Sequence, residues 1–262
     1  MSNHNYPNIA IGCQLSKCPQ VITLGVCPNL NDYPEDRIEL IRNSSKIYFP
    51  TSLYAEIFVT MGKEIFPSIG SYRFVGDKIK QTILFQLTGL PVPFTKFYYG
   101  PIQQKKILSD FSFPFVAKAA RNSSRGYGVW LINNSQELDT YLEHNQPAYI
   151  QEFLPASKDY RVVIVGDEAV HAYERIPVQN EFRANVSQGG KVKLGSVPEN
   201  ILRLALKASR ICGFNYAGLD ICESKGKLYI IEANMKFGTS GFKKAGLDLK
   251  RILCQIFEKN KI

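Results

Sequence analysis

Two carboxylates and one amide stand close together near the end of the chain. Asp220 lies in one short apolar run, and Glu232 and Asn234 end the next one, after a Lys225-Gly226 turn. Carboxylate and amide oxygens are the hard ligands that Mg²⁺ prefers, and Mg²⁺ commonly completes its shell with water and substrate phosphates. These residues therefore predict a magnesium site whose ligand is a nucleotide.

The predicted hairpin gathers these side chains in one register only. Alternate residues of a strand share a face, so we expect Ile230, Glu232 and Asn234 to point the same way. Asp220 joins them if it pairs with Ile230 or Glu232. That pairing requires an odd loop or a bulge near Lys225-Gly226, because a two-residue turn would send Asp220 to the opposite face. The alternative is a solvated hairpin whose acidic residues merely flank an apolar strand.

A second candidate site is the small-residue loop that follows Lys118. Its glycines allow close backbone approach to an anion, and its serines add hydroxyl donors, as a phosphate requires. Lys118 ends an apolar run, where an unpaired ammonium is costly and a phosphate would be a natural partner. The alternatives are an ordinary hairpin turn and a strand-end lysine that reaches solvent. The loop residues concerned are Ser123, Ser124, Arg125, Gly126 and Gly128.

Two further segments have the chemistry of a nucleotide or carboxylate site. The extended segment that contains Gln151, Glu152 and Phe153 offers backbone groups for an adenine edge beside apolar side chains. Arg161 and Arg183 each stand among apolar or small residues, and an arginine fork suits a carboxylate or a migrating phosphoryl group. Surface pairs between arginine and carboxylate are the alternative. No histidine, serine or cysteine has the spacing of a nucleophile and its base, so hydrolase chemistry of that kind is not expected.

Composition and charge fit a globular enzyme. The chain has 262 residues, 45% of them hydrophobic, and its six cysteines are expected to be free thiols. No apolar run approaches the roughly 20 residues of a membrane span, and the first residues lack a signal pattern, so we expect a cytoplasmic protein without a membrane partner. The net charge of +9 is dispersed. It suits polyanionic small molecules as well as nucleic acid, and charge alone does not choose between them.

The elements that must position these residues follow from periodicity and turn residues. An α/β layer is expected over residues 21–75, and Asp77 is the expected N-cap of the next helix. After it we expect strands at 115–118, 129–132 and 149–151 with a helix at 137–143. Antiparallel strands at 160–165 and 169–173 and a helix at 199–212 then lead to the acidic hairpin. The fold class is therefore α+β with an α/β N-terminal layer, which we divide into domains 1–75 and 76–262.

The order of these motifs, over about residues 74–250, resembles the ATP-grasp superfamily, and within it the carboxylate-amine ligases similar to the ribosomal-protein S6 glutamate ligase. The resemblance implies two α+β lobes, about 76–152 and 153–262, that sandwich ATP. It also implies ADP-forming ligation of a carboxylate to an amine through an acyl phosphate. The motifs that carry it are Asp77-Lys78, Lys118, Ser123 to Gly128, Gln151-Glu152-Phe153, Asp159-Tyr-Arg161, Arg183-Ala-Asn185, Gly189-Gly190, Ala217 to Asp220 and Glu232-Ala-Asn234.

The resemblance also assigns roles. Lys78 and Lys118 would contact the phosphates under the 123–128 loop, and Asp159 would lie near the ribose. Arg161, Arg183 and Asn185 would position the acyl phosphate and the nucleotide, while Asp220, Glu232 and Asn234 would hold one or two Mg²⁺ ions, with Mn²⁺ as an alternative. The sequence departs from the family at 235–238, Met-Lys-Phe-Gly, which puts the pocket for the amine in doubt.

We therefore expect an ATP-dependent ligase that adds glutamate or another amino acid to a peptide or small-molecule carboxylate. Two alternatives remain at this point. One is a nucleotide-binding factor associated with RNA or the ribosome and lacking ligase activity, and the other is a phosphotransferase that uses the same site. A nucleic-acid partner is the less favoured reading, and the sequence leaves the oligomeric state open between a monomer and a homodimer or larger assembly.

Overall fold

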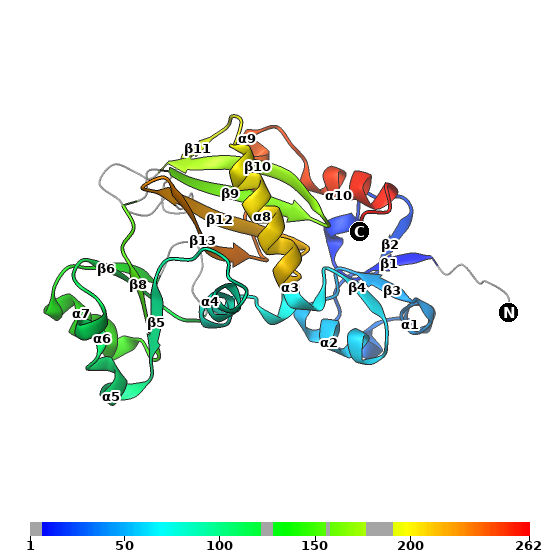
Figure 1. Cartoon of the computed structure of the whole chain (residues 1–262). Helices are drawn as coiled ribbons and strands as arrows, with labels where there is room; N and C mark the ends of the chain where they lie inside the picture. The colour runs from blue at the N-terminus through cyan, green and yellow to red at the C-terminus, as the bar shows by residue number, and fades with distance from the viewer. Residues whose placement is uncertain (1–6, 122–127, 156–157, 177–190) are drawn as a thin grey trace.

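The computed structural model of the protein describes residues 7–121, 128–155, 158–176 and 191–262. These residues form three β-sheets that follow one another along the molecule (Figure 1). A parallel sheet in blue and cyan lies at the end that carries the N-terminus, a five-stranded sheet occupies the middle, and a smaller green sheet lies at the other end. Among the described residues, no helix combines the length and apolar character needed to cross a membrane.

The first sheet is parallel, with strand order β2-β1-β3-β4. Parallel neighbours need crossover connections, which the helices of this unit supply. The strands are β1 (Asn8–Ala10), β2 (Val21–Thr23), β3 (Lys46–Tyr48) and β4 (Glu64–Phe66). The helices are η1 (Cys13–Leu15), η2 (Leu30–Asp32), α1 (Glu35–Asn43), α2 (Ser52–Thr60) and α3 (Ile69–Arg73).

The smallest unit contains an antiparallel sheet of order β5-β8-β6-β7. Its core is aromatic and aliphatic and includes Phe115, Ile150 and Tyr141. The strands are β5 (Thr95–Tyr98), β6 (Phe115–Lys118), β7 (Val129–Ile132) and β8 (Ala148–Glu152). The helices are α5 (Gly100–Gln104), α6 (Ile107–Asp110) and α7 (Ser135–His144).

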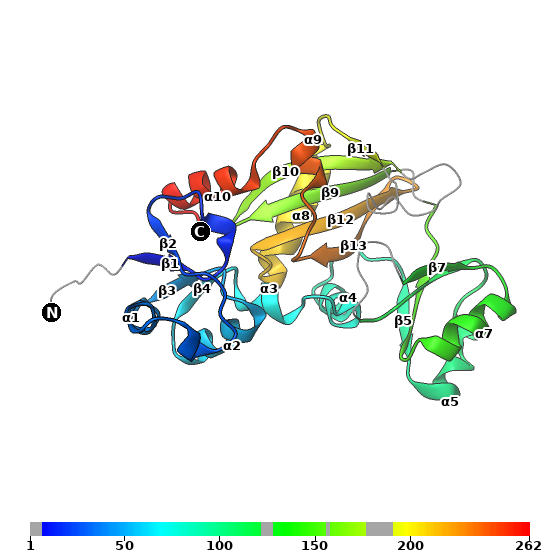
Figure 2. The ribbon, with the colours of Figure 1, turned by 180° about the vertical axis from the view of Figure 1, so that it is seen from behind.

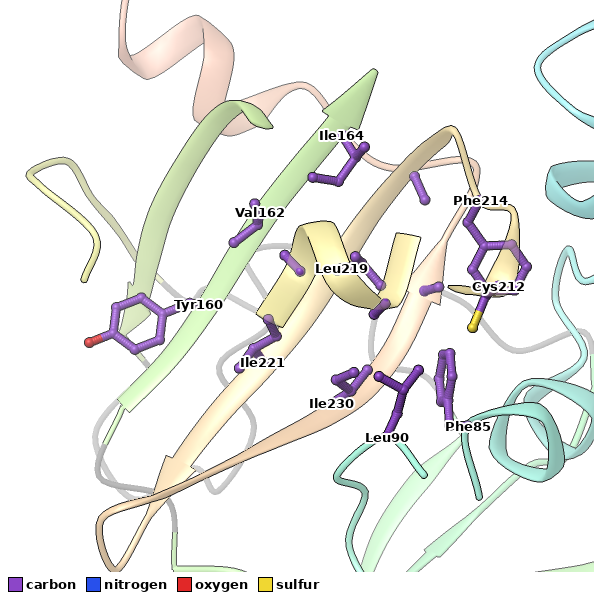
Figure 3. Packing of buried hydrophobic residues seen from close by; sticks show 14 of the residues in the cluster. Phe85, Leu90, Tyr160, Val162, Ile164, Cys212, Phe214, Leu219, Ile221 and Ile230 are labelled. Carbon is purple, nitrogen blue, oxygen red and sulfur yellow. The ribbon is translucent and has the colours of Figure 1, made fainter. Parts of the chain in front are cut away.

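The central sheet, of order β11-β10-β9-β12-β13, is antiparallel and has one apolar face. Helix α8 (Glu199–Cys212) covers that face, which includes Val162, Leu219 and Ile230, as Figure 3 shows. Because side chains alternate along a strand, the neighbours of these residues point to the other face. The strands are β9 (Lys158–Val165), β10 (Glu168–Ile176), β11 (Lys191–Lys193), β12 (Tyr216–Ser224) and β13 (Lys227–Asn234).

Two helices join the units to each other. Helix α4 (Lys78–Leu87) packs against β13 and brings Phe85 into the core of the central sheet. Helix α10 (Leu249–Glu258) has its buried residues on one face, and Leu253 and Phe257 pack with the first sheet, beside β1 and β2 in Figure 2. The remaining short helix is α9 (Ser240–Lys244).

The observed elements confirm the α+β class and most of the expected elements. The helix at 199–212 and the strands at 115–118 and 129–132 have the expected bounds. Asp77 is the N-cap of α4, because its carboxylate accepts a 2.9 Å hydrogen bond from the backbone N–H of Lys80. The predicted domain boundaries near residues 75 and 152 fall between the sheets. Helix α4 follows the first boundary but packs with the central sheet. The division into domains therefore stays a prediction.

Gln81 fixes α4 to the central sheet. Its buried amide donates hydrogen bonds of 2.9 Å to the carbonyls of Phe74 and Ala233 and accepts one of 3.0 Å from the N–H of Ala233. These bonds satisfy backbone groups of β13 that would otherwise be buried without partners. They also set the distance between the start of α4 and the end of β13, where the candidate site lies.

We predict that Gln81→Leu lowers the free energy of unfolding by about 1–3 kcal/mol, because it leaves buried backbone groups of Ala233 and Phe74 unpaired. Urea denaturation followed by circular dichroism measures the change. Gln136→Leu on the exposed face of α7 is the matched control and should change the stability by less than about 0.5 kcal/mol. Equal stability of the two variants would show that the Gln81 amide does not hold the two elements together.

Candidate active site

The polar face of the central sheet carries the predicted acidic residues in one register. Asp220 pairs with Glu232 of β13 on one side and with Arg161 of β9 on the other. Gly218, two residues before Asp220, pairs with Asn234. Of the two pairings expected for Asp220, with Ile230 or with Glu232, the structure has the one with Glu232, and the three predicted metal ligands lie on the same face.

The structure corrects the position of the bulge. The turn at Lys225-Gly226 has only two residues, and both have the positive φ angles, 50° and 73°, that tight hairpin turns require. The register shifts instead between Asp220 and Ile221, so Ile231 is the extra residue of β13. Consequently Ile230 points into the core and Glu232 to the polar face, and the expectation that these two side chains share a face was wrong.

Asp220 is the centre of a buried ion-pair network. Its carboxylate accepts hydrogen bonds from Nε and Nη2 of Arg161, the latter 2.9 Å long, and from Nη1 of Arg175 at 3.1 Å. Asn234 Nδ2 lies 3.3 Å from the same carboxylate. Asp220 is 2% exposed, so this pairing is what makes its charge tolerable in the interior.

Arg175 continues this network to the next carboxylate. Its Nε donates a 2.6 Å hydrogen bond to Asp159, the residue predicted to lie near the ribose. Burial alone would lower the pKa of Arg175, but Asp159 and Asp220 raise it above its usual value, so the guanidinium stays charged. Burial raises the pKa of Asp159, and Arg175 opposes that shift. Arg175 belongs to none of the sequence motifs above. It lies on this face because Tyr173, two residues before it in β10, pairs with Arg161.

Glu232 is held in its ionised form. Burial would raise its pKa, but Lys78, a hydrogen bond from Asn234 and the charges of Lys118 and Arg161 together lower the pKa to about 2. Nδ2 of Asn234 donates to Glu232 at 2.8 Å, and Nζ of Lys78 lies 3.8 Å from the other carboxylate oxygen. Lys78 is the first residue of α4, and its backbone N–H donates a 3.2 Å hydrogen bond to the carbonyl of Ala120, two residues after the end of β6.

Lys118 is buried on the same side of the molecule, at 5% exposure. Its ammonium lies 5.5 Å from the centre of the Tyr149 ring, and Tyr141 donates a 2.7 Å hydrogen bond to its carbonyl. Burial lowers the pKa of Lys118, and the carboxylates of Glu232 and Asp220 counteract this effect. The lysine at the end of the apolar run is therefore buried, which excludes the reading in which its ammonium reaches solvent.

Gly218 makes room for Arg161. A Cβ atom at this position would lie 2.9 Å from both Cδ of Arg161 and Cβ of Phe237. Real Cβ atoms do not approach other atoms so closely, so a larger residue here would require Arg161 or Phe237 to shift. Phe237 lies beside Gly218 and Arg161. The segment 235–238, in which the sequence departs from the family, therefore borders the site.

The residues of the predicted adenine segment have mixed surroundings. Gln151 is buried and donates a 2.9 Å hydrogen bond to Thr95. The backbone N–H of Glu152 donates to the carbonyl of Phe94, and its carboxylate accepts a 2.6 Å bond from the N–H of Phe94. The backbone N–H of Glu152 therefore already has a partner. Phe153 follows the end of β8, and its side chain is half-buried. Gly128 lies beside this unit, and its carbonyl accepts a 2.8 Å bond from Ala119.

Several predicted site residues lie outside the described part of the chain. Ser123, Ser124, Arg125 and Gly126 belong to the segment 122–127, and Arg183 and Asn185 to the segment 177–190. Their assignments stay predictions. The described residues that the structure brings together are Lys78, Lys118, Asp159, Arg161, Asp220, Glu232 and Asn234.

Comparison with known proteins identifies the class to which this fold and site belong. The model of the RimK-like ATP-grasp domain matches residues 75–257. The chain therefore belongs to the RimK-like ATP-grasp family, as the resemblance predicted, and it is an ATP-grasp ligase of the carboxylate-amine type. Members of this family use ATP and Mg²⁺.

The chain is similar to a probable alpha-L-glutamate ligase of Haemophilus influenzae (strain PittEE), with 29% identity over 208 residues, which covers 76% of this chain and 70% of the relative. Among solved structures, the RimK domain ATP-grasp protein from Sphaerobacter thermophilus has a TM-score of 0.68 at 14% identity, covering 95% of this chain and 98% of that one. The ATP-grasp ligase PsnB, complexed with a phosphomimetic variant of its minimal precursor, Mg and ADP, has a TM-score of 0.63 at 15% identity, covering 83% and 79%. Both structures support the ATP-grasp fold.

The donor set fits Mg²⁺, the ion that the family implies. Asp220, Glu232 and Asn234 provide only hard oxygen ligands, and Glu232 is ionised. Asp220 already accepts four hydrogen bonds, which use about all the lone-pair sites of a carboxylate. Glu232 is therefore the carboxylate with more capacity left for a cation. Asn234 now presents Nδ2 to both carboxylates, and a flip of its amide would present Oδ1 instead.

We predict a pH-dependent stability contribution from Glu232. Because its pKa in the folded state is about 2, below the usual 4.5, the contribution is present above about pH 4.5 and is lost as the pH falls toward 2. Glu232→Gln should lower the free energy of unfolding by up to about 3 kcal/mol at pH 7, and by roughly half of that or less at pH 3. Urea titrations at the two pH values measure this difference.

The matched control is Glu143→Gln, an exposed glutamate of α7. It should leave the stability close to that of the wild type at both pH values, because an exposed side chain contributes little. A Glu232→Gln variant whose stability deficit is the same at pH 7 and at pH 3 would contradict the lowered pKa.

Proposed function

We propose that the protein is an ADP-forming ligase that joins an amine to a carboxylate through an acyl phosphate. The amine is glutamate or another amino acid, and the carboxylate belongs to a peptide or a small molecule. The observation that carries this proposal is the convergence of Lys78, Lys118 and Arg161 on the buried carboxylate of Asp220 and the half-buried carboxylate of Glu232. Phosphoryl transfer needs positioning and charge neutralisation more than covalent help from the protein, and this set of charges provides both.

The proposed reaction has two steps. A carboxylate oxygen of the acid attacks the γ-phosphorus of ATP, the bond from that phosphorus to the bridging oxygen breaks, and ADP leaves. The amine nitrogen then attacks the carbonyl carbon of the acyl phosphate, a C–N bond forms, the C–O bond to phosphate breaks, and the amine gives up one proton. The products are the amide, ADP and inorganic phosphate, so the atoms and charges balance.

In this proposal the chain's cations bind the triphosphate. Lys78 and Lys118 contact the phosphates, and the 123–128 loop covers them, with the backbone near Glu152 and Phe153 at the adenine and Asp159 near the ribose. Arg161, together with Arg183 and Asn185, positions the reacting acid. Asp220, Glu232 and Asn234 would hold one or two Mg²⁺ ions, or Mn²⁺ in their place, and the bound ions would supply positive charge beside the phosphoryl group. Water must be excluded because it would hydrolyse the acyl phosphate.

We predict that Lys118→Met abolishes stabilisation by Mg-ATP without lowering the stability of the free protein. The buried ammonium is costly when no phosphate is bound, so the melting temperature of the free variant should equal or exceed that of the wild type. For the wild type, ATP at 100 times its Kd adds about 2.7 kcal/mol, or about 5–10 °C for a chain of this size. Differential scanning fluorimetry with and without Mg-ATP measures both quantities.

Lys105→Met is the control, because Lys105 is exposed in the same unit. It should retain the shift of the wild type. If Lys118→Met showed an undiminished shift with Mg-ATP, Lys118 would not be a phosphate ligand, although the ligase assignment would stand.

A second prediction concerns the acyl phosphate. With Mg-ATP, an accepted acid and hydroxylamine in place of the amine, the protein should form a hydroxamate together with ADP. Glu232→Gln should lower this rate by about 100-fold or more, because the variant loses the carboxylate that would hold the cation beside the transferring phosphoryl group, whereas Glu143→Gln should not. The ferric-hydroxamate colour reaction and coupled ADP detection measure the two products.

The outcomes of this experiment separate the proposed function from the phosphotransferase alternative. ADP released with a stable phosphorylated product and no hydroxamate would favour transfer to a hydroxyl group. ATP turnover that does not depend on any acid would contradict the proposed function altogether.

A further inference from the structure

A cluster of two cysteines and one glutamate joins segments from opposite ends of the chain. Cys18 lies between η1 and β2, whereas Cys254 and Glu258 lie on α10, the helix beside β1 and β2 in Figure 2. The two sulfur atoms and a carboxylate oxygen all lie within 4.8 Å of one another. Both cysteines are free thiols, so no disulfide occupies the cluster.

The spacing of residues on α10 brings two of these side chains to Cys18. Residues four apart in a helix are neighbours on its surface, so Cys254 and Glu258 point the same way. Both cysteines are buried in the core between α10 and the first sheet, at 3% and 7% exposure, whereas Glu258 is exposed. The cluster therefore has two buried sulfurs and one side open to solvent, by which a small ion can enter.

Gln20 adds an oxygen to the cluster. Its Oε1 accepts a 3.1 Å hydrogen bond from the Cys18 thiol, and its Nε2 donates one of 3.3 Å to the Glu258 carboxylate. The Cys254 thiol donates a 3.5 Å bond to the same carboxylate oxygen. No lysine, arginine or histidine among the described residues forms an ion pair with Glu258. The donor set is thus two sulfurs and two oxygens without a positive charge among them.

The separation of these donor atoms suits a zinc-class ion. Zn²⁺ binds cysteine sulfur at about 2.3 Å and carboxylate oxygen at about 2.0–2.2 Å in a tetrahedral shell, so its ligand atoms lie roughly 3.3–3.8 Å apart. The 3.5 Å between Cys254 Sγ and Glu258 Oε1 already matches, and Cys18 Sγ needs only a small side-chain adjustment. Thiolate ligands also select such an ion over Mg²⁺, which prefers oxygen.

We propose that Cys18, Cys254 and Glu258 form a binding site for a thiophilic divalent cation of the zinc class, with Gln20 Oε1 or a water molecule as the fourth ligand. Binding replaces the two thiol protons, which pass to the solvent, and leaves two thiolates and one carboxylate on the ion. The site shares no residue with the candidate active site, and the inference does not depend on the proposed function. A bound ion would tie α10 to the segment before β2.

The test titrates Co²⁺ and then Zn²⁺ into the reduced protein in excess Mg²⁺, which competes for the oxygen ligands of the candidate active site. Co²⁺ bound to thiolates absorbs in the near ultraviolet by charge transfer from sulfur, whereas Co²⁺ bound only to carboxylates does not. The wild type should develop this band with a single equivalent of Co²⁺ and lose it to Zn²⁺. Free Zn²⁺ at about 100 times its Kd should also raise the melting temperature by about 5–10 °C.

Substitutions of the three ligands should weaken the binding of Co²⁺. Cys18→Ser and Cys254→Ser should each lower the affinity by about 100-fold or more, because each removes a thiolate. The matched control is Cys27→Ser, a half-buried cysteine that packs with the first sheet, and it should keep the wild-type band and affinity. Glu258→Gln changes an exposed side chain and so spares the fold. It should lower the affinity about tenfold or more and keep the sulfur band, whereas Glu39→Gln on the exposed face of α1 should have no effect.

Three results would overturn the inference. The first is a wild type that shows no charge-transfer band. The second is an affinity for Co²⁺ that neither cysteine substitution lowers, or that Glu258→Gln lowers no more than Glu39→Gln does. The third is a disulfide between Cys18 and Cys254 in protein purified without reductant, combined with no binding of Zn²⁺ after its reduction, because the two sulfurs would then form a redox pair.

Discussion

The pairing of Asp220 with two arginines is the interaction on which the polar face of the central sheet depends. Desolvating three charges costs several kcal/mol per ion, and only full hydrogen bonding offsets that cost. Arg161 meets Asp220 because β9 and β12 pair in register, and Arg175 reaches it from β10. Removing one partner would leave a buried charge uncompensated, so the three strands must keep their relative positions. This rigid base is what holds Glu232 and Asn234 in place.

The bulge at Ile231 reconciles two demands on β13. Residues before it must face α8 to complete the core, as Ile230 does, while Glu232 must face Asp220. Strict alternation would place Ile230 and Glu232 on the same face. Either Ile230 would leave the core, or Glu232 would lose its contacts with Lys78 and Asn234. One extra residue solves the conflict at the cost of a locally broken ladder, which is consistent with the tendency of bulges to occur beside active sites.

The sequence predicted the chemistry of this site better than its geometry. Residue types and order were enough to predict that Asp220, Glu232 and Lys118 come together, while their roles stay predictions. The apolar stripe of α8 predicted that helix with its bounds, because Ile201, Ala205 and Ala208 recur at helical spacing. Strand β1, which has three residues and precedes the expected α/β layer, was not recognised from the sequence. The position of the bulge and the role of Arg175 depend on which strands become neighbours, which is a tertiary property that local periodicity does not contain.

The charge balance of the site explains why so many cations are gathered before any nucleotide is bound. Lys78, Lys118, Arg161 and Arg175 face Asp159, Asp220 and Glu232, so among the described residues four cations stand against three carboxylates. The excess falls on Lys118, whose lowered pKa reflects a charge that burial disfavours and the carboxylates only partly stabilise. A triphosphate would supply the missing negative charge where solvent is already excluded, so the cost of burying Lys118 in the free protein becomes favourable interaction in the complex.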